Sequence, residues 1–288
     1  MLLRGVMDLH FALAVDAHRA TARQWRMPRI LSPRCLPWFL ALLAAYACCA
    51  AALESRLVHG AEGDYRVVTV DLSHDALSLH WRDADDRPFG SIDALRRQGD
   101  AQGTPLLFAT NAGIYDREFR PLGLTIADGR TLRPLNSAGG SGRAGNFGMQ
   151  PNGIFYVDKN GHAGVAATRT WTERRIDARL ATQSGPMLVI DGEINPNFLE
   201  NSDSRKWRSG VCAETPDRAV FAISTMPVTF HAFARLFRDE IHCRDALYLD
   251  GTLSQIYTAT DGYSGAPAMM LRPYAGMFAV FADTPASK

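Results

Sequence analysis

Short β-type runs that end in tight-turn residues recur through most of this chain and restrict its fold more than any other feature. Asp128-Gly129, Asn160-Gly161 and Asp191-Gly192 each separate or follow such runs. Asp-Gly and Asn-Gly pairs readily adopt the positive φ angles that hairpin turns need. The predicted hairpin strands are residues 122–127 with 131–135, 154–157 with 163–167, and 187–190 before the third turn.

An earlier hairpin is expected nearer the N-terminus. Residues 53–64 are polar and are interpreted as a loose lead-in. The alternating, β-branched runs 65–72 and 76–81 follow it, separated by Ser73-His74-Asp75. Alternation with a period of two predicts half-buried strands, so these runs are expected to pair with each other.

Two segments carry helical signals. Residues 91–99 predict a short helix, with Ser91 as N-cap and Gly99 as the residue that ends it. Residues 230–241 place apolar side chains at helical spacing and predict a second helix. The remaining expected strands are residues 106–110, 220–224, 246–249, 269–272 and 277–281.

These elements favour an α+β fold in which strands outnumber helices. No Pro, Gly or Ser linker divides residues 65–282. We therefore expect a single domain, residues 65–288, with a mixed, hairpin-rich β-sheet and a few helices. The 31 basic and 30 acidic residues leave a net charge of +1. No overall field attracts nucleic acid, so an anionic substrate needs local arginines.

The N-terminal segment has the order of a secretory signal peptide. Four arginines precede the uncharged apolar run 36–52, which ends in the small residues Ala50-Ala51-Ala52. Residues 1–52 are assigned to this leader, and Met27 is a candidate for the true start. An uncleaved membrane anchor is the alternative. Periplasmic or secreted location would favour a disulfide between Cys212 and Cys243, the two cysteines beyond the leader, over two free thiols.

Several familiar catalytic motifs do not fit. Gly140-Ser-Gly-Arg-Ala-Gly145 matches a dinucleotide-binding pattern, but Asn146-Phe-Gly-Met-Gln-Pro after it does not open a helix. Residues 137–148 are therefore interpreted as a flexible glycine-rich loop. The serines lack the glycines of a nucleophile elbow, and the histidines show no metal-ligand spacing.

Acids, amides and arginines instead recur where expected strands end. The strand 106–110 breaks into Thr110-Asn111-Ala112-Gly113 and is soon followed by Asp116-Arg117-Glu118. Carboxylates beside hydroxyl-binding amides suit a sugar, and paired carboxylates are the usual apparatus for cleaving a glycosidic bond. The planar fork of arginine suits a phosphate.

Five short segments together resemble the phosphodiester glycosidase family, which includes the catalytic domain of N-acetylglucosamine-1-phosphodiester α-N-acetylglucosaminidase. They occur in the family's order across about residues 65–282. The matching segments are Thr110-Asn-Ala-Gly-Ile-Tyr-Asp, Gly145-Asn-Phe-Gly-Met-Gln-Pro-Asn-Gly, Gln183-Ser-Gly-Pro-Met-Leu-Val-Ile-Asp-Gly, Arg208-Ser-Gly-Val-Cys and Leu247-Tyr-Leu-Asp-Gly-Thr-Leu-Ser. The chain departs from the family in having Ala112, Thr252 and Leu253 where glycines are common.

The resemblance implies a secreted or periplasmic hydrolase that cleaves a sugar-1-phosphodiester in a glycan or glycoconjugate. The catalytic candidates are Asp250, Asp116 and Glu118, and the substrate-binding candidates are Asn111, Gly113, Asn152, Gln183, Ser184, Arg205, Arg208 and Ser254. No cofactor is expected, although oxygen ligands for a divalent cation stay open. The alternatives are an envelope polysaccharide-binding protein without activity and a metal-dependent phosphodiesterase. The expected partner is a glycan phosphodiester and not nucleic acid, with membrane contact only through an uncleaved N-terminal segment.

Overall fold

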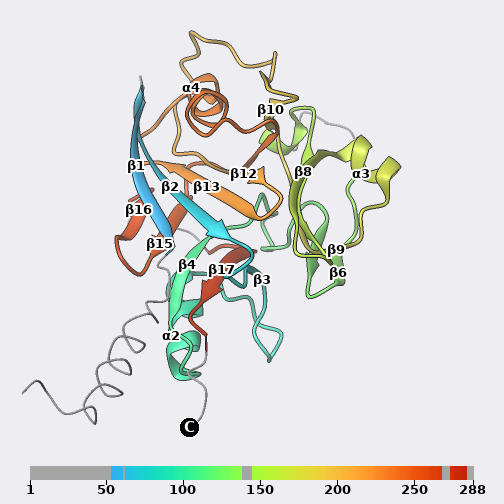
Figure 1. Cartoon of the computed structure of the whole chain (residues 1–288), viewed down its shortest axis with the longest axis vertical. Coiled ribbons are helices and arrows are strands. Elements are labelled where there is room, and N and C mark those ends of the chain that lie inside the picture. The colour runs from blue at the N-terminus through green and yellow to red at the C-terminus, as the bar shows by residue number, and fades with distance from the viewer. Residues whose placement is uncertain (1–52, 61, 138–144, 268–272, 284–288) are drawn as a thin grey trace, which may run out of the picture. The chain divides into compact units, whose positions relative to one another are not determined.

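The computed structural model describes residues 53–60, 62–137, 145–267 and 273–283 (Figure 1). Contacts between Cα atoms group residues 52–288 into one compact unit. The expected leader, at residues 1–52, lies outside the described residues, as does most of the glycine-rich loop and the expected strand 269–272. In the described part, no helix is both long enough and apolar enough to cross a bilayer.

The strands of the described chain form three β-sheets. The seven-stranded sheet has the order β1 (Glu54–Gly60), β2 (Gly63–Asp71), β13 (Arg218–Ser224), β12 (Ser209–Thr215), β14 (Ala246–Asp250), β10 (Met187–Ile190) and β11 (Glu193–Ile194). The second sheet has five strands, in the order β16 (Gly262–Gly265), β15 (Gln255–Thr258), β4 (Leu106–Asn111), β17 (Met277–Phe281) and β3 (Ser78–His80). The third sheet also has five strands, in the order β6 (Arg130–Arg133), β5 (Thr125–Ala127), β9 (Ala178–Ser184), β7 (Gly153–Asp158) and β8 (Ala163–Ala167).

Every strand pair between the described elements is antiparallel, so the expected mixed sheet is wrong and the fold is largely β. The chain order of residues 220–249 is strand, helix, strand. Strands β13 and β14 flank that helix as predicted, but they are not neighbours. Strand β12 lies between them and pairs antiparallel with both.

The hairpins with Asp-Gly and Asn-Gly turns are confirmed. Strands β5 and β6 pair across Asp128 and Gly129, whose φ angles are 49° and 72°. Strands β10 and β11 pair across Asp191 and Gly192, with φ angles of 51° and 89°. Strands β7 and β8 also pair as expected. Two consecutive residues with positive φ give the turn whose twist matches that of the flanking strands.

The hairpin expected from residues 65–72 and 76–81 is wrong. Strand β2 pairs with β1 and β13, whereas β3 pairs with β17 in a different sheet. The lead-in at 54–60 is not loose, because it forms β1 and pairs with β2 from Glu54–Thr69 to Gly60–Gly63. Alternation shows that a segment is a strand, but it does not say which strand lies beside it.

Helix α2 (Ile92–Ala101) begins as predicted, since the Ser91 hydroxyl accepts a hydrogen bond from the Ala94 amide at 3.1 Å. It does not end at Gly99. The chain leaves the helix at Gln102 and Gly103, whose φ of 72° suits a helix C-terminus. Gly99 is instead a packing residue, because a Cβ there would lie 2.6 Å from the Thr104 carbonyl oxygen.

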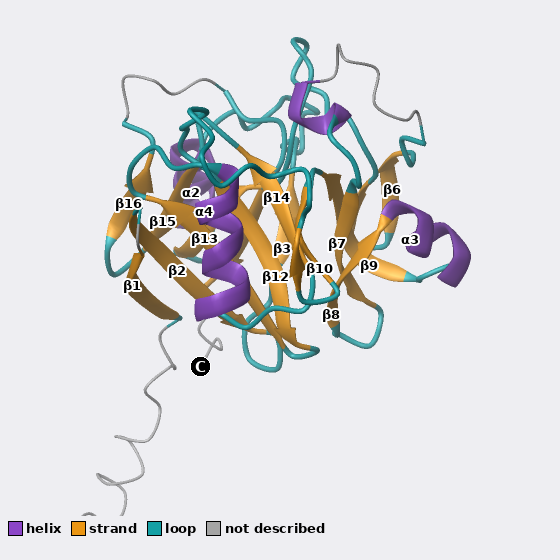
Figure 2. Ribbon diagram, turned by 90° about the horizontal axis from the view of Figure 1, so that it is seen from above, coloured by secondary structure: helices purple, strands orange, loops and turns teal. Residues whose placement is uncertain are grey.

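The second predicted helix is also present, in two parts. Helix α4 (Phe230–Arg235) begins at the Thr229 cap and continues into the π-helical turn η2 (Leu236–Glu240). Phe233 and Phe237 are fully buried in a cluster with side chains of the seven-stranded sheet. The helix thus covers one face of that sheet (Figure 2). A short helix α3 (Thr168–Arg174) and a 3₁₀ turn η1 (Gly145–Gly148) complete the described helical elements.

Four phenylalanine rings join the three sheets at their common core. Phe221 belongs to the seven-stranded sheet, Phe108 and Phe278 to the second and Phe155 to the third, and all four are fully buried. Their ring centroids lie between 5.0 and 5.7 Å apart in the pairs that touch. Burying such a ring contributes about 1.5–3 kcal/mol. This shared core fixes how the strand ends meet.

Candidate active site

Strand ends from all three sheets converge around Asp250. Asp250 is the last residue of β14, and Ser209, the first residue of β12, lies opposite it in the strand register. Asn111 ends β4 of the second sheet, and Ser184 ends β9 of the third. Asn111, Ser184 and Ser209 are at most 1% exposed. Rigid strands therefore hold these polar side chains in place.

A chain of hydrogen bonds connects two of the sheets to the loop after Asp250. The Asn111 Nδ2 atom donates to Ser209 Oγ at 3.2 Å, and Ser209 Oγ donates to Ser254 Oγ at 3.0 Å. Ser254 Oγ in turn donates to the Gly251 carbonyl oxygen at 3.0 Å. Buried hydroxyls and amides cost free energy unless they are paired. Each member therefore helps to fix the loop 250–254.

The third sheet is tied to the same place. Ser184 Oγ donates to the Leu249 carbonyl oxygen at 2.9 Å, one residue before Asp250. Thr182 Oγ1 donates to the Ala112 carbonyl oxygen at 2.5 Å. Gly113, with a φ of 141°, packs against this strand, and a Cβ there would lie 3.1 Å from Thr182 Oγ1. The predicted cluster of Asn111, Gly113 and Ser184 is thus brought together.

The Asp250 carboxylate has an unusual electrostatic environment. Its Oδ1 atom accepts a hydrogen bond from the Gly251 amide at 2.7 Å. Among the described residues it forms no ion pair. Burial raises the pKa of Asp250 to about 7, and the Gly251 hydrogen bond opposes this only in part. Such a carboxyl group exchanges its proton near neutral pH, which suits acid–base catalysis.

Two tyrosines support the loop after Asp250, and neither was singled out from the sequence. The Tyr274 hydroxyl donates to the Leu253 carbonyl oxygen at 2.8 Å. A Cβ at Gly251 would overlap the Tyr248 hydroxyl, so the absence of a side chain at Gly251 permits this close approach. Ser209 was also missed as a site residue, although it follows Arg208 within a segment quoted for the resemblance. A signal was therefore present for Ser209, but none marked Tyr274.

Arg208 lies near this group but is not open to solvent. Only 1% of the residue is exposed, and its guanidinium donates to the carbonyl oxygens of Val228 and Ser204, each at 2.9 Å. The guanidinium carbon lies 3.6 Å from the centroid of the Phe230 ring and 5.8 Å from that of Tyr248. Burial lowers the pKa of Arg208. Its Nη1 atom is buried without a hydrogen-bond partner among the described residues.

Asp116 and Glu118 form a separate charged turn. Asp116 Oδ1 accepts hydrogen bonds from the amides of Glu118 and Arg120, and Arg120 also pairs with both carboxylates. Burial opposes the shift, but the backbone and side-chain hydrogen bonds of Arg120 lower the pKa of Asp116. The structure records no contact between these acids and Asp250. The hydrogen bonds and ion pairs within residues 116–120 are those of a turn.

Two predicted amides are held by internal hydrogen bonds. Gln183 Oε1 accepts from the amides of Leu124 and Asn136, and Gln183 Nε2 donates to the Asn136 carbonyl oxygen. Asn152 Nδ2 donates to the Phe147 carbonyl oxygen at 2.8 Å, while its buried Oδ1 has no partner among the described residues. Both side chains anchor neighbouring backbone, so their expected contact with substrate stays a prediction.

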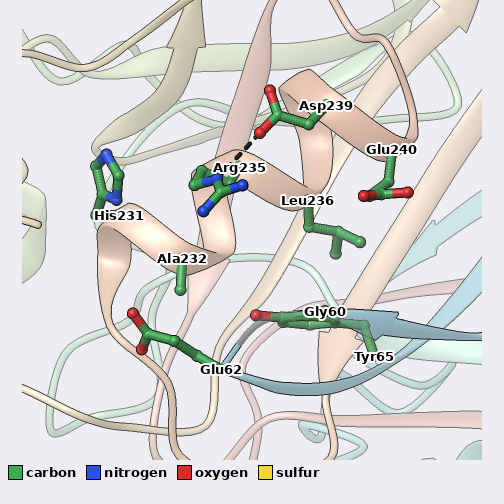
Figure 3. Close-up of a pocket in the computed structure, with 9 residues that line it drawn as sticks. All are labelled: Gly60, Glu62, Tyr65, His231, Ala232, Arg235, Leu236, Asp239 and Glu240. Carbon is green, nitrogen blue, oxygen red and sulfur yellow. Dashed lines mark hydrogen bonds and ion pairs between the residues drawn. The ribbon is translucent and has the colours of Figure 1, made fainter.

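Arg205 belongs to another part of the surface. Its Nη1 atom pairs with Glu62 at 2.8 Å, and Glu62 borders a hollow between β1–β2 and α4 (Figure 3). Tyr65 and His231 also line this hollow, and Arg235 pairs there with Asp239 at 3.1 Å. No predicted catalytic residue lines it. Arg205 is therefore not grouped with Asp250.

Two further expectations concern covalent and metal chemistry. Cys212 and Cys243 are joined by a disulfide, as predicted. Within the described ranges, no three His, Cys, Asp or Glu side chains are arranged to hold a metal ion. Residues 138–144 of the glycine-rich loop lie outside the described residues.

The chain is similar in sequence to a known family and to a bacterial protein. The family model for phosphodiester glycosidases matches residues 105–281. The uncharacterized protein YigE of Escherichia coli (strain K12) is 37% identical over 191 residues, which cover 66% of this chain and 72% of that protein.

Two solved structures have a similar fold. The catalytic domain of zebrafish N-acetylglucosamine-1-phosphodiester α-N-acetylglucosaminidase, auto-inhibited by its pro-peptide, aligns with a TM-score of 0.56 and 15% identity, over 81% of this chain and 84% of that one. A hypothetical protein from Synechocystis aligns with a TM-score of 0.50 and 13% identity, over 80% of this chain and 62% of that one. At these identities the likeness concerns the fold alone.

Proposed function

The chain belongs to the phosphodiester glycosidase family, and we propose that it is a hydrolase that cleaves a sugar-1-phosphodiester at its glycosidic bond. The observation that carries this proposal is the position of Asp250. It combines a pKa raised to about 7 with a place where strand ends of three sheets meet. Enzyme sites commonly hold a carboxyl group with such a raised pKa on a rigid frame.

Asp250 is assigned as the catalytic carboxylate. A phosphate ester is already a good leaving group, so the reaction needs little help from a general acid. In its ionised form, Asp250 removes a proton from water as the water oxygen bonds to the anomeric carbon, or attacks that carbon directly. In either case the bond between the anomeric carbon and the phosphate oxygen breaks, and the phosphate departs with the bonding electrons.

The neighbouring polar residues are assigned mainly to positioning. Asn111, Ser209 and Ser254 use their side chains to hold the loop after Asp250. Arg208 is the proposed source of positive charge for the phosphate. Because its guanidinium is buried and forms no ion pair among the described residues, its charge is weakly screened and acts at a distance.

The substrate is proposed to be a glycan or glycoconjugate outside the cytoplasm. The Cys212–Cys243 disulfide supports an oxidising compartment, either the periplasm or the medium. The basic, apolar and small-residue order of the N-terminal segment supports the same location.

The test is hydrolysis of a panel of sugar-1-phosphodiesters by the purified protein in ¹⁸O-labelled water, with and without a chelator. We expect the label on the released sugar and no effect of the chelator. Label on the phosphate would mean cleavage of the phosphorus–oxygen bond and would favour a phosphodiesterase. No turnover of any substrate, with glycan binding intact, would favour a binding protein.

A further inference from the structure

A second concave surface lies between the start of helix α2 and the β15–β16 hairpin. We call it the β15–β16 pocket. Its lining includes Asp93, Gln255, Tyr263, Ser264, Ala266 and Pro267. None of these residues takes part in the chemistry assigned to Asp250. The pocket therefore needs its own explanation.

An aromatic ring is held at the side of this pocket. Tyr263 is 41% exposed, one of few large apolar side chains left open in the described part of the chain. Its ring centroid lies 5.1 Å from that of Tyr257, and its hydroxyl donates to Asp93 Oδ1 at 2.8 Å. The ring is thus fixed at both its face and its tip. A fixed, exposed ring gives a ligand apolar contact at little entropic cost.

The polar groups of the pocket are mostly hydrogen-bond acceptors. Arg96 pairs with Asp93 at 3.2 Å, so the two charges offset each other. Gln255 Nε2 donates to the Ala266 carbonyl oxygen at 2.9 Å, and Gln255 Oε1 has no hydrogen bond within the described residues. Asp93 Oδ2 likewise accepts none there. An exposed ring beside free acceptors, without a free cation, suits a neutral molecule with many hydroxyls.

The β15–β16 pocket shares a backbone segment with the candidate site. Gln255 directly follows Ser254 of the hydrogen-bond chain, and its carbonyl oxygen accepts from Thr110 at 2.9 Å. The amide of Ala266, which also lines the pocket, donates to the Ser254 carbonyl oxygen at 2.9 Å. The pocket is therefore built on residues 254–255, which directly follow the loop after Asp250.

We propose that the β15–β16 pocket is a subsite for a neutral sugar ring of the glycan that carries the scissile phosphodiester, with Tyr263 as the stacking platform. The inference rests on the proposed function for the link between the two sites. It narrows the substrate class to an oligosaccharide or polysaccharide, because a single sugar phosphodiester would leave this pocket empty.

The experiment measures binding and not turnover. Saturation-transfer difference NMR follows titration of the full protein with neutral trisaccharides of α-1,4-glucose, β-1,4-glucose and β-1,4-N-acetylglucosamine. We expect at least one to bind. Tyr263→Ala should weaken that binding about tenfold, as loss of a stacked ring would. Tyr263→Phe should keep most of the affinity because the ring remains.

The control is Leu199→Ala, which truncates an apolar side chain that is 72% exposed and does not line the pocket. It should bind the trisaccharide as the unchanged protein does. The proposal is overturned if no trisaccharide binds, or if Tyr263→Ala binds as tightly as the unchanged protein. Turnover of a monosaccharide-1-phosphodiester by the unchanged protein is measured separately. Its absence would count against the proposed function and not against the subsite.

Discussion

The side-chain amide nitrogen of Asn111 lies 3.2 Å from the Ser209 hydroxyl and joins two β-sheets at the point where both present their strand ends. The two residues are 98 positions apart in the chain. Ser209 also lies opposite Asp250 in the strand register. This one contact therefore couples the second sheet to the residue proposed to be catalytic.

The first prediction concerns pH. Because Asp250 acts in its ionised form and its pKa is raised to about 7, kcat/KM should rise with pH, bend near pH 7 and level off above it. Asp250→Asn should lower kcat at least about a thousandfold, as loss of an essential catalytic group does. A pH–rate profile of the purified protein provides the measurement. A rate that falls as pH rises through 7 would instead assign Asp250 as a general acid.

The second prediction concerns stability, which should fall as pH rises, whereas kcat/KM should rise. The folded-state pKa of Asp250 lies above its ordinary value of 3.8. The folded protein therefore holds this proton where the unfolded chain has lost it, and stability falls as pH rises from about 4 to 7. Asp250→Asn should remove that loss, which is on the order of a few kcal/mol.

Thermal unfolding of the unchanged protein and of Asp250→Asn at pH 4 and pH 8 measures this loss of stability. The variant should have a higher Tm than the unchanged protein at pH 8 and nearly the same Tm at pH 4. An equal Tm difference at both values would show that the effect does not come from ionisation of Asp250.

The third prediction concerns Ser209. Ser209→Ala removes the hydroxyl that links Asn111 to Ser254 and leaves buried polar groups unpaired. We expect a loss of about 1–3 kcal/mol in the free energy of unfolding, together with a lower kcat, measured by urea denaturation and by kinetics. Ser204→Ala, at an exposed serine whose hydroxyl makes no hydrogen bond in the described chain, is the control and should change neither. An unchanged kcat in Ser209→Ala would show that the hydrogen bonds of Ser209 do not affect catalysis.

The fourth prediction concerns the contact between Gly251 and Tyr248. Gly251→Ala introduces a Cβ that overlaps the Tyr248 hydroxyl, so the loop must move and kcat should fall. Adding Tyr248→Phe removes that hydroxyl oxygen and should restore part of the activity. Comparison of kcat for the single and double variants tests the contact. If the double variant is no more active than Gly251→Ala, the overlap is not the cause.

The fifth prediction separates the two candidate carboxylates. Asp116→Asn weakens an exposed ion pair with Arg120 and should cost less than about 1 kcal/mol of stability. It should leave kcat/KM within about twofold of the unchanged value, since the structure places Asp116 in a local turn. A loss comparable to that of Asp250→Asn would return Asp116 to the catalytic group.

Local structure was predictable where short-range chemistry decides it. The turns at Asp128-Gly129 and Asp191-Gly192 follow from the φ angles that these residue pairs accept. The N-cap at Ser91 follows from a hydroxyl that can reach an amide three residues later. Strand partners were not predictable in the same way. The neighbours of β2 come from residues 54–60 and 218–224, and no local signal selects them.

The sequence by itself determined the three hairpins with Asp-Gly or Asn-Gly turns, the main helices and a list of polar residues at strand ends that includes Asp250. Only the tertiary structure decided which of those residues contact one another. It placed the bonds of Asp116 within its own turn, buried Arg208, and brought Ser209, Tyr248 and Tyr274 beside residues 250–253. The physical reason is that a pKa depends on burial and neighbouring charges, which arise only when distant strands pack. Hairpin turns need only their own residues, whereas the Asp250 site needs three sheets.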